Sequence, residues 1–103
     1  MYIFLSFISL SVFSQEEKKH IREGNKLCKA KKYEEANKSY EKALEKNNQS
    51  IKADFNLGDA LYKQKKFAEA GQQFQKVADK TNDKELKAGA YHNLGNSLLQ
   101  SQK

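Results

Sequence analysis

The sequence is poor in the residues that build most catalytic and metal sites. Its 103 residues include one cysteine, two histidines, no proline and no tryptophan. His20 and His92 are far apart, and no cysteine or pair of acidic residues stands at metal-ligand spacing around either. There is no glycine-rich phosphate loop and no nucleophile elbow. We therefore expect a protein that is not an enzyme and uses no metal, cofactor or small-molecule substrate.

The lone cysteine excludes an internal disulfide. Cys28 follows Leu27 and precedes Ala30 by two residues, in a segment predicted to be helical. We expect a small, buried or half-buried hydrophobic residue there. The alternative, a redox role, would need an exposed thiol with a lowered pKa.

No apolar run is long enough to span a membrane, which takes about 20 residues. The longest runs from Tyr2 to Phe13 and is interrupted by three serines. It fits the apolar core of a secretory signal peptide over residues 1–14, with Val12-Phe13-Ser14 as the cleavage site. We therefore expect a periplasmic or otherwise exported protein, with association with the membrane as an open alternative. No Lys or Arg precedes the run, so a longer natural start and an uncleaved, packed tail stay open as alternatives.

Charge of one sign is not concentrated in any segment. The net charge of +6 arises after Gln15, and the lysines are spread along the rest of the chain. This distribution predicts a solvated surface with at most a preference for acidic partners or anionic lipids. Nucleic-acid binding calls for clustered basic residues with stacking aromatics. Because the aromatics here fall at packing positions, we expect no nucleic-acid partner.

The chain contains a repeat of 34 residues. Gly24 and Gly58 are separated by this interval (58 − 24). The flanking residues keep the register in the pairs Leu27/Leu61, Tyr33/Phe67, Ala36/Ala70, Tyr40/Phe74 and Asn48/Asn82. A third copy begins at Ala90 and contains Leu94-Gly95. A period of this length predicts an all-α array of helix-turn-helix units stacked in series.

The order of residue types within each unit resembles the tetratricopeptide repeat (TPR) family. The second unit carries its pattern at Phe55, Leu57, Gly58, Leu61, Phe67, Ala70, Phe74 and Val77. The first unit has Glu23 where leucine is usual, and Asn48 and Asn82 replace the closing proline. The resemblance covers roughly residues 17–103. It implies a right-handed superhelix of antiparallel helix pairs, about two and a half repeats, that acts as a scaffold for protein or peptide partners.

Two segments also resemble the TPR proteins of bacterial aerotolerance (Bat) operons. They are Phe55 to Phe67 and Ala90 to Leu98, taken together with the signal-like start. Proteins of that group are envelope proteins thought to work beside membrane-bound von Willebrand A-type partners. The resemblance implies an envelope location and membrane-bound partners for this chain.

The repeat predicts five helices, over about 17–31, 33–46, 50–64, 68–80 and 84–100. Residues 17–50 form the first repeat, 51–83 the second, and 84–103 the first helix of a third. Ser50 and Asp83 are the expected N-caps, because their side chains accept from free N–H groups of a first helical turn. The second and third glycines are 37 residues apart (95 − 58). We expect the extra residues to lengthen the loop before the fifth helix and to add a turn at its start.

Glycine is scarce, yet it recurs at one position inside the first helix of each unit, at Gly24, Gly58 and Gly95. Glycine in a helix costs about 1 kcal/mol relative to alanine. Its recurrence predicts a neighbouring helix that passes too close for a Cβ. The other residues expected to define the packing between helices are Tyr33, Ala36, Tyr40, Leu57, Phe67, Ala70, Phe74 and Leu94.

The resemblance also implies where a partner binds, since the first helices of TPR units line the concave face. The matching positions are Asn25, Lys29, Lys52, Asn56, Asp59, Lys63, Asn93 and Asn96. Four of these are asparagines, whose amides offer a donor and an acceptor to the backbone of an extended peptide. The three lysines favour an acidic segment. The alternative is that these asparagines simply face solvent.

A self-assembling structural protein is the alternative function. The predicted fifth helix lacks a partner helix, which leaves Leu94, Leu98 and Leu99 as an apolar edge. Repeat arrays end in a helix with a polar outer face. We therefore expect either that the 103 residues belong to a longer array or that this edge meets another chain.

Overall fold

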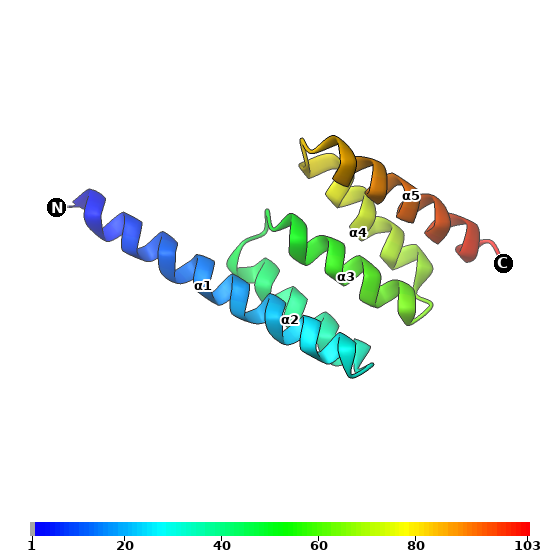
Figure 1. The fold of residues 1–103 in the computed structure, drawn as a ribbon, viewed down its shortest axis with the longest axis horizontal. Helices are drawn as coiled ribbons and strands as arrows, with labels where there is room; N and C mark the ends of the chain where they lie inside the picture. The colour runs from blue at the N-terminus through cyan, green and yellow to red at the C-terminus, as the bar shows by residue number, and fades with distance from the viewer. Residues whose placement is uncertain (1) are drawn as a thin grey trace.

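The computed structural model describes the backbone of residues 2–103 and the side chains of residues 14–103. It contains five α-helices: α1 (Tyr2–Lys29), α2 (Tyr33–Lys46), α3 (Ile51–Lys63), α4 (Phe67–Lys80) and α5 (Lys84–Ser101). Helices α1, α3 and α5 run in one direction, and α2 and α4 return between them (Figure 1). Each helix packs on the next along the chain. The predicted all-α array of helix pairs is confirmed.

The first helix is much longer than predicted, because it begins at Tyr2 and not near residue 17. Its first half projects beyond the other helices (Figure 1), and the molecule measures 58 × 31 × 17 Å. The helix continues without a break through the predicted cleavage site. The apolar side chains behind the signal-peptide prediction lie outside the described side chains, so it stays a prediction. Within residues 2–103, no helix combines the length and the apolar character needed to cross a membrane.

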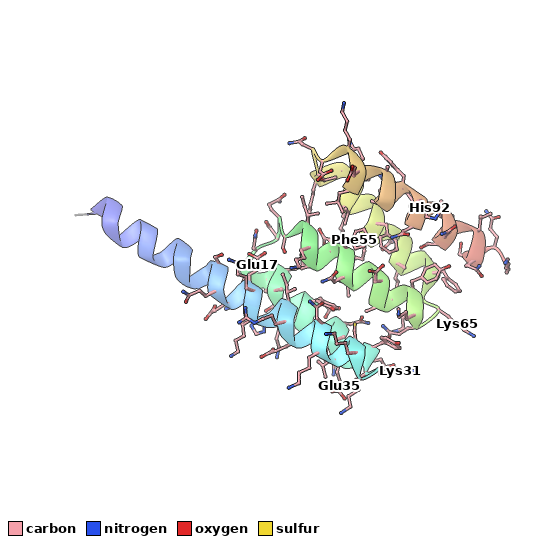
Figure 2. The ribbon with its side chains drawn as sticks, in the orientation of Figure 1. Glu17, Lys31, Glu35, Phe55, Lys65 and His92 are labelled. Atoms are coloured by element: carbon pink, nitrogen blue, oxygen red, sulfur yellow. The ribbon has the colours of Figure 1, made fainter. Side chains whose placement is uncertain are left out.

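Both turns inside the repeats have the same backbone geometry. Lys31 and Lys65 adopt left-handed conformations, with φ of 60° and 63°. In the first turn the N–H of Lys32 donates to Leu27 O at 2.9 Å, and in the second the N–H of Lys66 donates to Leu61 O at 2.9 Å. This pattern closes the end of a helix and satisfies its last carbonyls. The two turns lie at the same end of the array (Figure 2).

The predicted caps are confirmed, but the predicted long loop is wrong. Ser50 Oγ accepts from Ala53 N at 3.3 Å, and Asp83 Oδ1 accepts from Glu85 N at 3.0 Å. The connection between α4 and α5 is residues 81–83, shorter than residues 47–50 between α2 and α3. Helix α5 begins 11 residues before Gly95 (95 − 84), whereas α3 begins seven before Gly58 (58 − 51). The extra residues therefore form a helical turn, which satisfies their backbone internally.

Two of the three repeated glycines meet an aromatic ring, as predicted. A Cβ on Gly58 would lie 2.8 Å from Cε1 of Phe74, and a Cβ on Gly24 would overlap the ring of Tyr40. Both rings are buried in one core cluster that also contains Ala36, Leu57, Ala60, Leu61 and Ala70. The glycines thus let the two helices of each repeat approach closely, while the rings fill the space between repeats.

The third repeated glycine departs from this pattern. Nothing lies within 4 Å of a Cβ built on Gly95, so its packing role stays a prediction. The place of Leu94 in an exposed edge is wrong, because this side chain packs against the core cluster. Its Cδ1 lies 3.3 Å from the Cβ position of Gly71 on α4. The difference arises because Leu94 faces the preceding repeat, whereas Gly95 faces away from it.

Candidate functional site

One face of the array is formed by α1, α3 and α5, and Glu17, Phe55 and His92 lie in a row across it (Figure 2). Four cavities hollow this face, with volumes of about 330, 360, 140 and 340 Å³. Neighbouring cavities share lining residues, namely Asn25, Lys52, Asn56 and Asp59. They form one continuous depression, here called the groove.

The structure brings every predicted partner-binding residue to the groove. The cavity of about 360 Å³ is lined by Asn25, Lys29, Asn56, Asp59 and Lys63. Asn93 and Asn96 line the small cavity, which also contains Asp59. Lys52 borders the remaining two cavities. That these residues contact a partner stays a prediction.

A hydrogen-bond network fixes the first two asparagines. Tyr40 Oη donates to Asn25 Oδ1 at 2.7 Å, and Asn56 Nδ2 donates to the same oxygen at 3.1 Å. Cys28 Sγ lies 3.5 Å from Tyr40 Oη. Either atom can be the donor in this contact. Among the described residues, no partner is found for Asn25 Nδ2 or Asn56 Oδ1, which leaves a donor and an acceptor beside the groove.

Tyr40 was predicted only as a packing residue, and its hydroxyl is one part of the site that the sequence did not predict. Burial raises the pKa of Tyr40, and the hydrogen bond with Cys28 and the charges of Cys28 and Asp59 raise it further. The hydroxyl therefore stays a donor at neutral pH. A signal was present in the sequence: the second repeat has Phe74 at this position, and a buried tyrosine hydroxyl requires a partner.

Asp59 takes the place of Asn25 in the second repeat, 34 residues later (59 − 25). The aromatic residue of that repeat is Phe74, which has no hydroxyl to donate. No hydrogen bond or ion pair to the Asp59 carboxylate is found among the described residues. Burial raises the pKa of Asp59, and the positive charge of Lys63 offsets part of that increase. A half-buried carboxylate without a donor therefore lies where two cavities meet.

The groove also contains an apolar part between the first turns of α3 and α5. Ile51, Phe55 and Leu86 line it, together with Lys52 and Asn56. Phe55 is held by an edge-to-face contact with Phe74, at 5.6 Å between ring centroids and 71° between planes. Ile51 and Leu86 were not among the predicted site residues, because only the stacking of the repeats brings them together.

Over residues 14–103, no group of three or more His, Cys, Asp or Glu side chains is arranged to hold a metal ion. Cys28 is half-buried, as expected for a small hydrophobic residue.

Comparison with known proteins agrees with the repeat pattern and the helix packing. The family model described as Tetratricopeptide repeat matches residues 27–95, which is more than half of the chain. No curated protein matches the sequence. Repeats of this kind in general mediate protein–protein interaction and are non-enzymatic. The chain belongs to the tetratricopeptide repeat family.

Proposed function

We propose that this protein is a scaffold whose groove binds an extended segment of a partner protein. One observation carries the proposal. The donor Asn25 Nδ2, the acceptor Asn56 Oδ1 and the Asp59 carboxylate have no partner among the described residues and border the same cavity. Polar groups that are half-buried lose hydration, so a ligand that pairs with them gains more than a ligand on an open surface.

An extended peptide has the chemistry that these groups require. Its backbone alternates N–H groups with C=O groups. Asp59 and Asn56 accept hydrogen bonds from the N–H groups, and Asn25 donates one to a C=O group. An apolar side chain of the peptide fits the cavity formed by Ile51, Phe55 and Leu86. The exposed lysines at the rim, Lys29, Lys52 and Lys63, favour an acidic residue in the ligand.

The groove can be tested with peptides that are selected, from a displayed library of random peptides, for binding to the 103-residue chain. The double variant Asn56→Ala/Asn93→Ala should bind the selected peptides at least tenfold more weakly. The matched control is Gln72→Ala/Gln75→Ala, which removes two exposed amides from α4 outside the groove. Selected peptides that bind a correctly folded Asn56→Ala/Asn93→Ala variant as tightly as the parent chain would exclude the groove as the contact surface.

We further propose that the scaffold works in the bacterial envelope, beside membrane-bound partners in an aerotolerance-type complex. The support is the apolar run at residues 2–13 and the resemblance to Bat-operon TPR proteins. In native cells, the protein should be found in the envelope fraction with a mature start at Gln15 by mass spectrometry. Crosslinking there should capture a membrane-bound von Willebrand A-type protein. An intact chain in the cytoplasmic fraction, with no such partner, would refute this location.

A further inference from the structure

The second contact between repeats lacks a hydrogen-bond network that the first contact has. At the first contact, Asn25 Oδ1 accepts from Tyr40 Oη at 2.7 Å and from Asn56 Nδ2 at 3.1 Å. The repeats are related by intervals of 34 (59 − 25 and 74 − 40) and 37 (93 − 56). At these intervals, the equivalent residues of the second contact are Asp59, Phe74 and Asn93.

Both hydrogen bonds are missing at the second contact. Phe74 has no hydroxyl to donate, and no hydrogen bond between Asp59 and Asn93 is found among the described residues. The small cavity of about 140 Å³ lies there instead, lined by Asp59, Tyr62, Phe74, Asn93 and Asn96. A carboxylate thus borders an open cavity at the position where two donors close the first contact.

The polar groups of the small cavity favour a ligand that donates hydrogen bonds. The ionised Asp59 carboxylate can only accept them. Asn96 Nδ2 lies 3.3 Å from His92 Nε2. Because an amide nitrogen can only donate, this contact leaves Asn96 Oδ1 as an acceptor beside the cavity. No side chain that lines the cavity is positively charged. The cavity therefore fits a cation with several N–H groups.

Lys63 does not supply that cation. It follows Asp59 by four residues on α3, and its charge lowers the pKa of the Asp59 carboxyl. Its side chain is nevertheless exposed and does not line the small cavity. No ion pair between the two residues is found in the described part of the chain. The carboxylate is therefore available to a ligand.

We propose that the small cavity binds an arginine side chain of the segment that the groove holds. This inference rests on the proposed function and adds a residue that the bound segment contains. A planar guanidinium can donate two parallel N–H bonds to the Asp59 carboxylate, which replace the two hydrogen bonds that Asn25 receives. A further N–H remains for Asn96 Oδ1. The rings of Tyr62 and Phe74 provide the aromatic surface on which a guanidinium packs.

Arginine fits this cavity better than lysine does. An ammonium is a strongly hydrated point charge, whereas a guanidinium is planar, more weakly hydrated and matched to a carboxylate. Asp59 also borders the cavity of about 360 Å³, and its two oxygens have enough acceptor positions for a backbone N–H of the segment as well. The segment therefore combines an arginine at the small cavity with the acidic residue that the lysines at the rim favour.

Small compounds can test the cavity without any peptide. N-acetyl-arginine methylamide, titrated into the isotope-labelled 103-residue chain, should shift the NMR signals of Asp59 and of the Asn93 and Asn96 side-chain amides. The shifts should saturate in the millimolar range. The corresponding citrulline compound has nearly the same shape and no charge, and it should bind about tenfold more weakly. The lysine compound should bind several-fold more weakly.

Variants of the chain locate the contact. Asp59→Asn keeps the shape of the side chain and removes its charge, so the arginine compound should bind about tenfold more weakly. Asp79→Asn removes an exposed carboxylate from α4, outside the groove, and is the matched control. Phe74→Tyr should also weaken binding, because the new hydroxyl can donate to Asp59 as that of Tyr40 donates to Asn25.

Peptide selection separates this inference from the proposed function. Peptides selected against the parent chain should share an arginine at one position, and those selected against Asp59→Asn should lose this preference. If no selected peptide depends on Asn56 and Asn93 while the arginine compound binds as described, the proposed function fails and the cavity still binds a guanidinium.

The opposite results would overturn the inference. They are the absence of saturable shifts with the arginine compound, equal binding of the arginine and citrulline compounds, or equal binding by Asp59→Asn and Asp79→Asn. Selected peptides that depend on Asn56 and Asn93 but share no arginine would also exclude it, and would leave the scaffold function supported.

Discussion

Lys80 Nζ lies 2.6 Å from Oδ2 of Asp54, whose side chain is 1% exposed. The same ammonium donates to the carbonyl of Asn48 at 2.6 Å. Lys80 ends α4, Asp54 lies in the first turn of α3, and Asn48 belongs to the loop before it. One side chain thus ties the second repeat to its connection with the first.

Removing this ammonium should destabilise the fold strongly. Lys80→Ala leaves a buried carboxylate without its partner, and breaking a buried ion pair costs several kcal/mol. Because the Lys80 side chain is 21% exposed, we expect the free energy of unfolding to fall by about 2–3 kcal/mol. Chemical denaturation followed by circular dichroism measures the loss. Lys76→Ala, an exposed lysine one turn earlier on α4, is the control and should change stability by less than about 0.5 kcal/mol.

Two glycine variants should shift stability in opposite directions. Alanine favours a helix by about 1 kcal/mol over glycine. At Gly89 an added Cβ meets nothing, so Gly89→Ala should raise the free energy of unfolding by about 0.5–1 kcal/mol. At Gly58 the Cβ would lie 2.8 Å from a buried ring, and overpacking should outweigh the helix gain, for a net loss of about 1–2 kcal/mol. Thermal unfolding of both variants measures these changes. A Gly58→Ala variant more stable than the parent chain would contradict the close packing of α3 on α4.

Replacing either left-handed turn residue with glycine should stabilise the fold. Lys31 and Lys65 have φ near 60°, a conformation that costs a side-chain-bearing residue about 1–2 kcal/mol. Lys31→Gly and Lys65→Gly should each raise the free energy of unfolding by about 0.5–1 kcal/mol after the entropy cost of glycine. Lys32→Gly and Lys66→Gly are matched controls, since those residues have φ of −93° and −87°. Equal effects at all four positions would show that the turn geometry is not the cause.

Asp59 should make stability fall as pH rises. Its pKa in the folded protein is raised above the ordinary value of 3.8, so the native state binds the proton more tightly than the unfolded state. Stability is therefore highest below the unfolded pKa and declines as pH rises through the raised pKa. Asp59→Asn should be more stable than the parent chain at pH 7, and the two should become nearly equal at about pH 3.

A second variant tests the cause of that shift. The charge of Lys63 lowers the pKa of Asp59, so Lys63→Met should reduce stability at pH 7 but much less at about pH 3. Urea denaturation of the three proteins across this range is the measurement. If Asp59→Asn and the parent chain have the same stability at every pH, the carboxylate is not held in an unfavourable environment, and the argument for a ligand donor loses its support.

The helical architecture followed from the repeat, and the place of the groove was implied by the resemblance to the TPR family. Matching positions at an interval of 34 put Asn25 and Asp59, or Gly24 and Gly58, in equivalent surroundings, because each repeat folds in the same way. All eight predicted contact residues consequently line one groove. The start of α1 and the length of the α4–α5 connection were not predictable in this way. They depend on how far a helix extends beyond its packing partner, and the repeat carries no information about that.

The amino-acid order alone determined the helix pairs, the caps at Ser50 and Asp83 and the two glycines on which rings pack, since these depend on local propensity and on the spacing of small and aromatic side chains. Only the tertiary structure decided which of these residues act together. It aimed the Tyr40 hydroxyl at Asn25, left Asp59 without a donor because Phe74 stands in the equivalent place, and opened Gly95 while covering Leu94. Such outcomes depend on distances between helices, which are set when the repeats pack against one another.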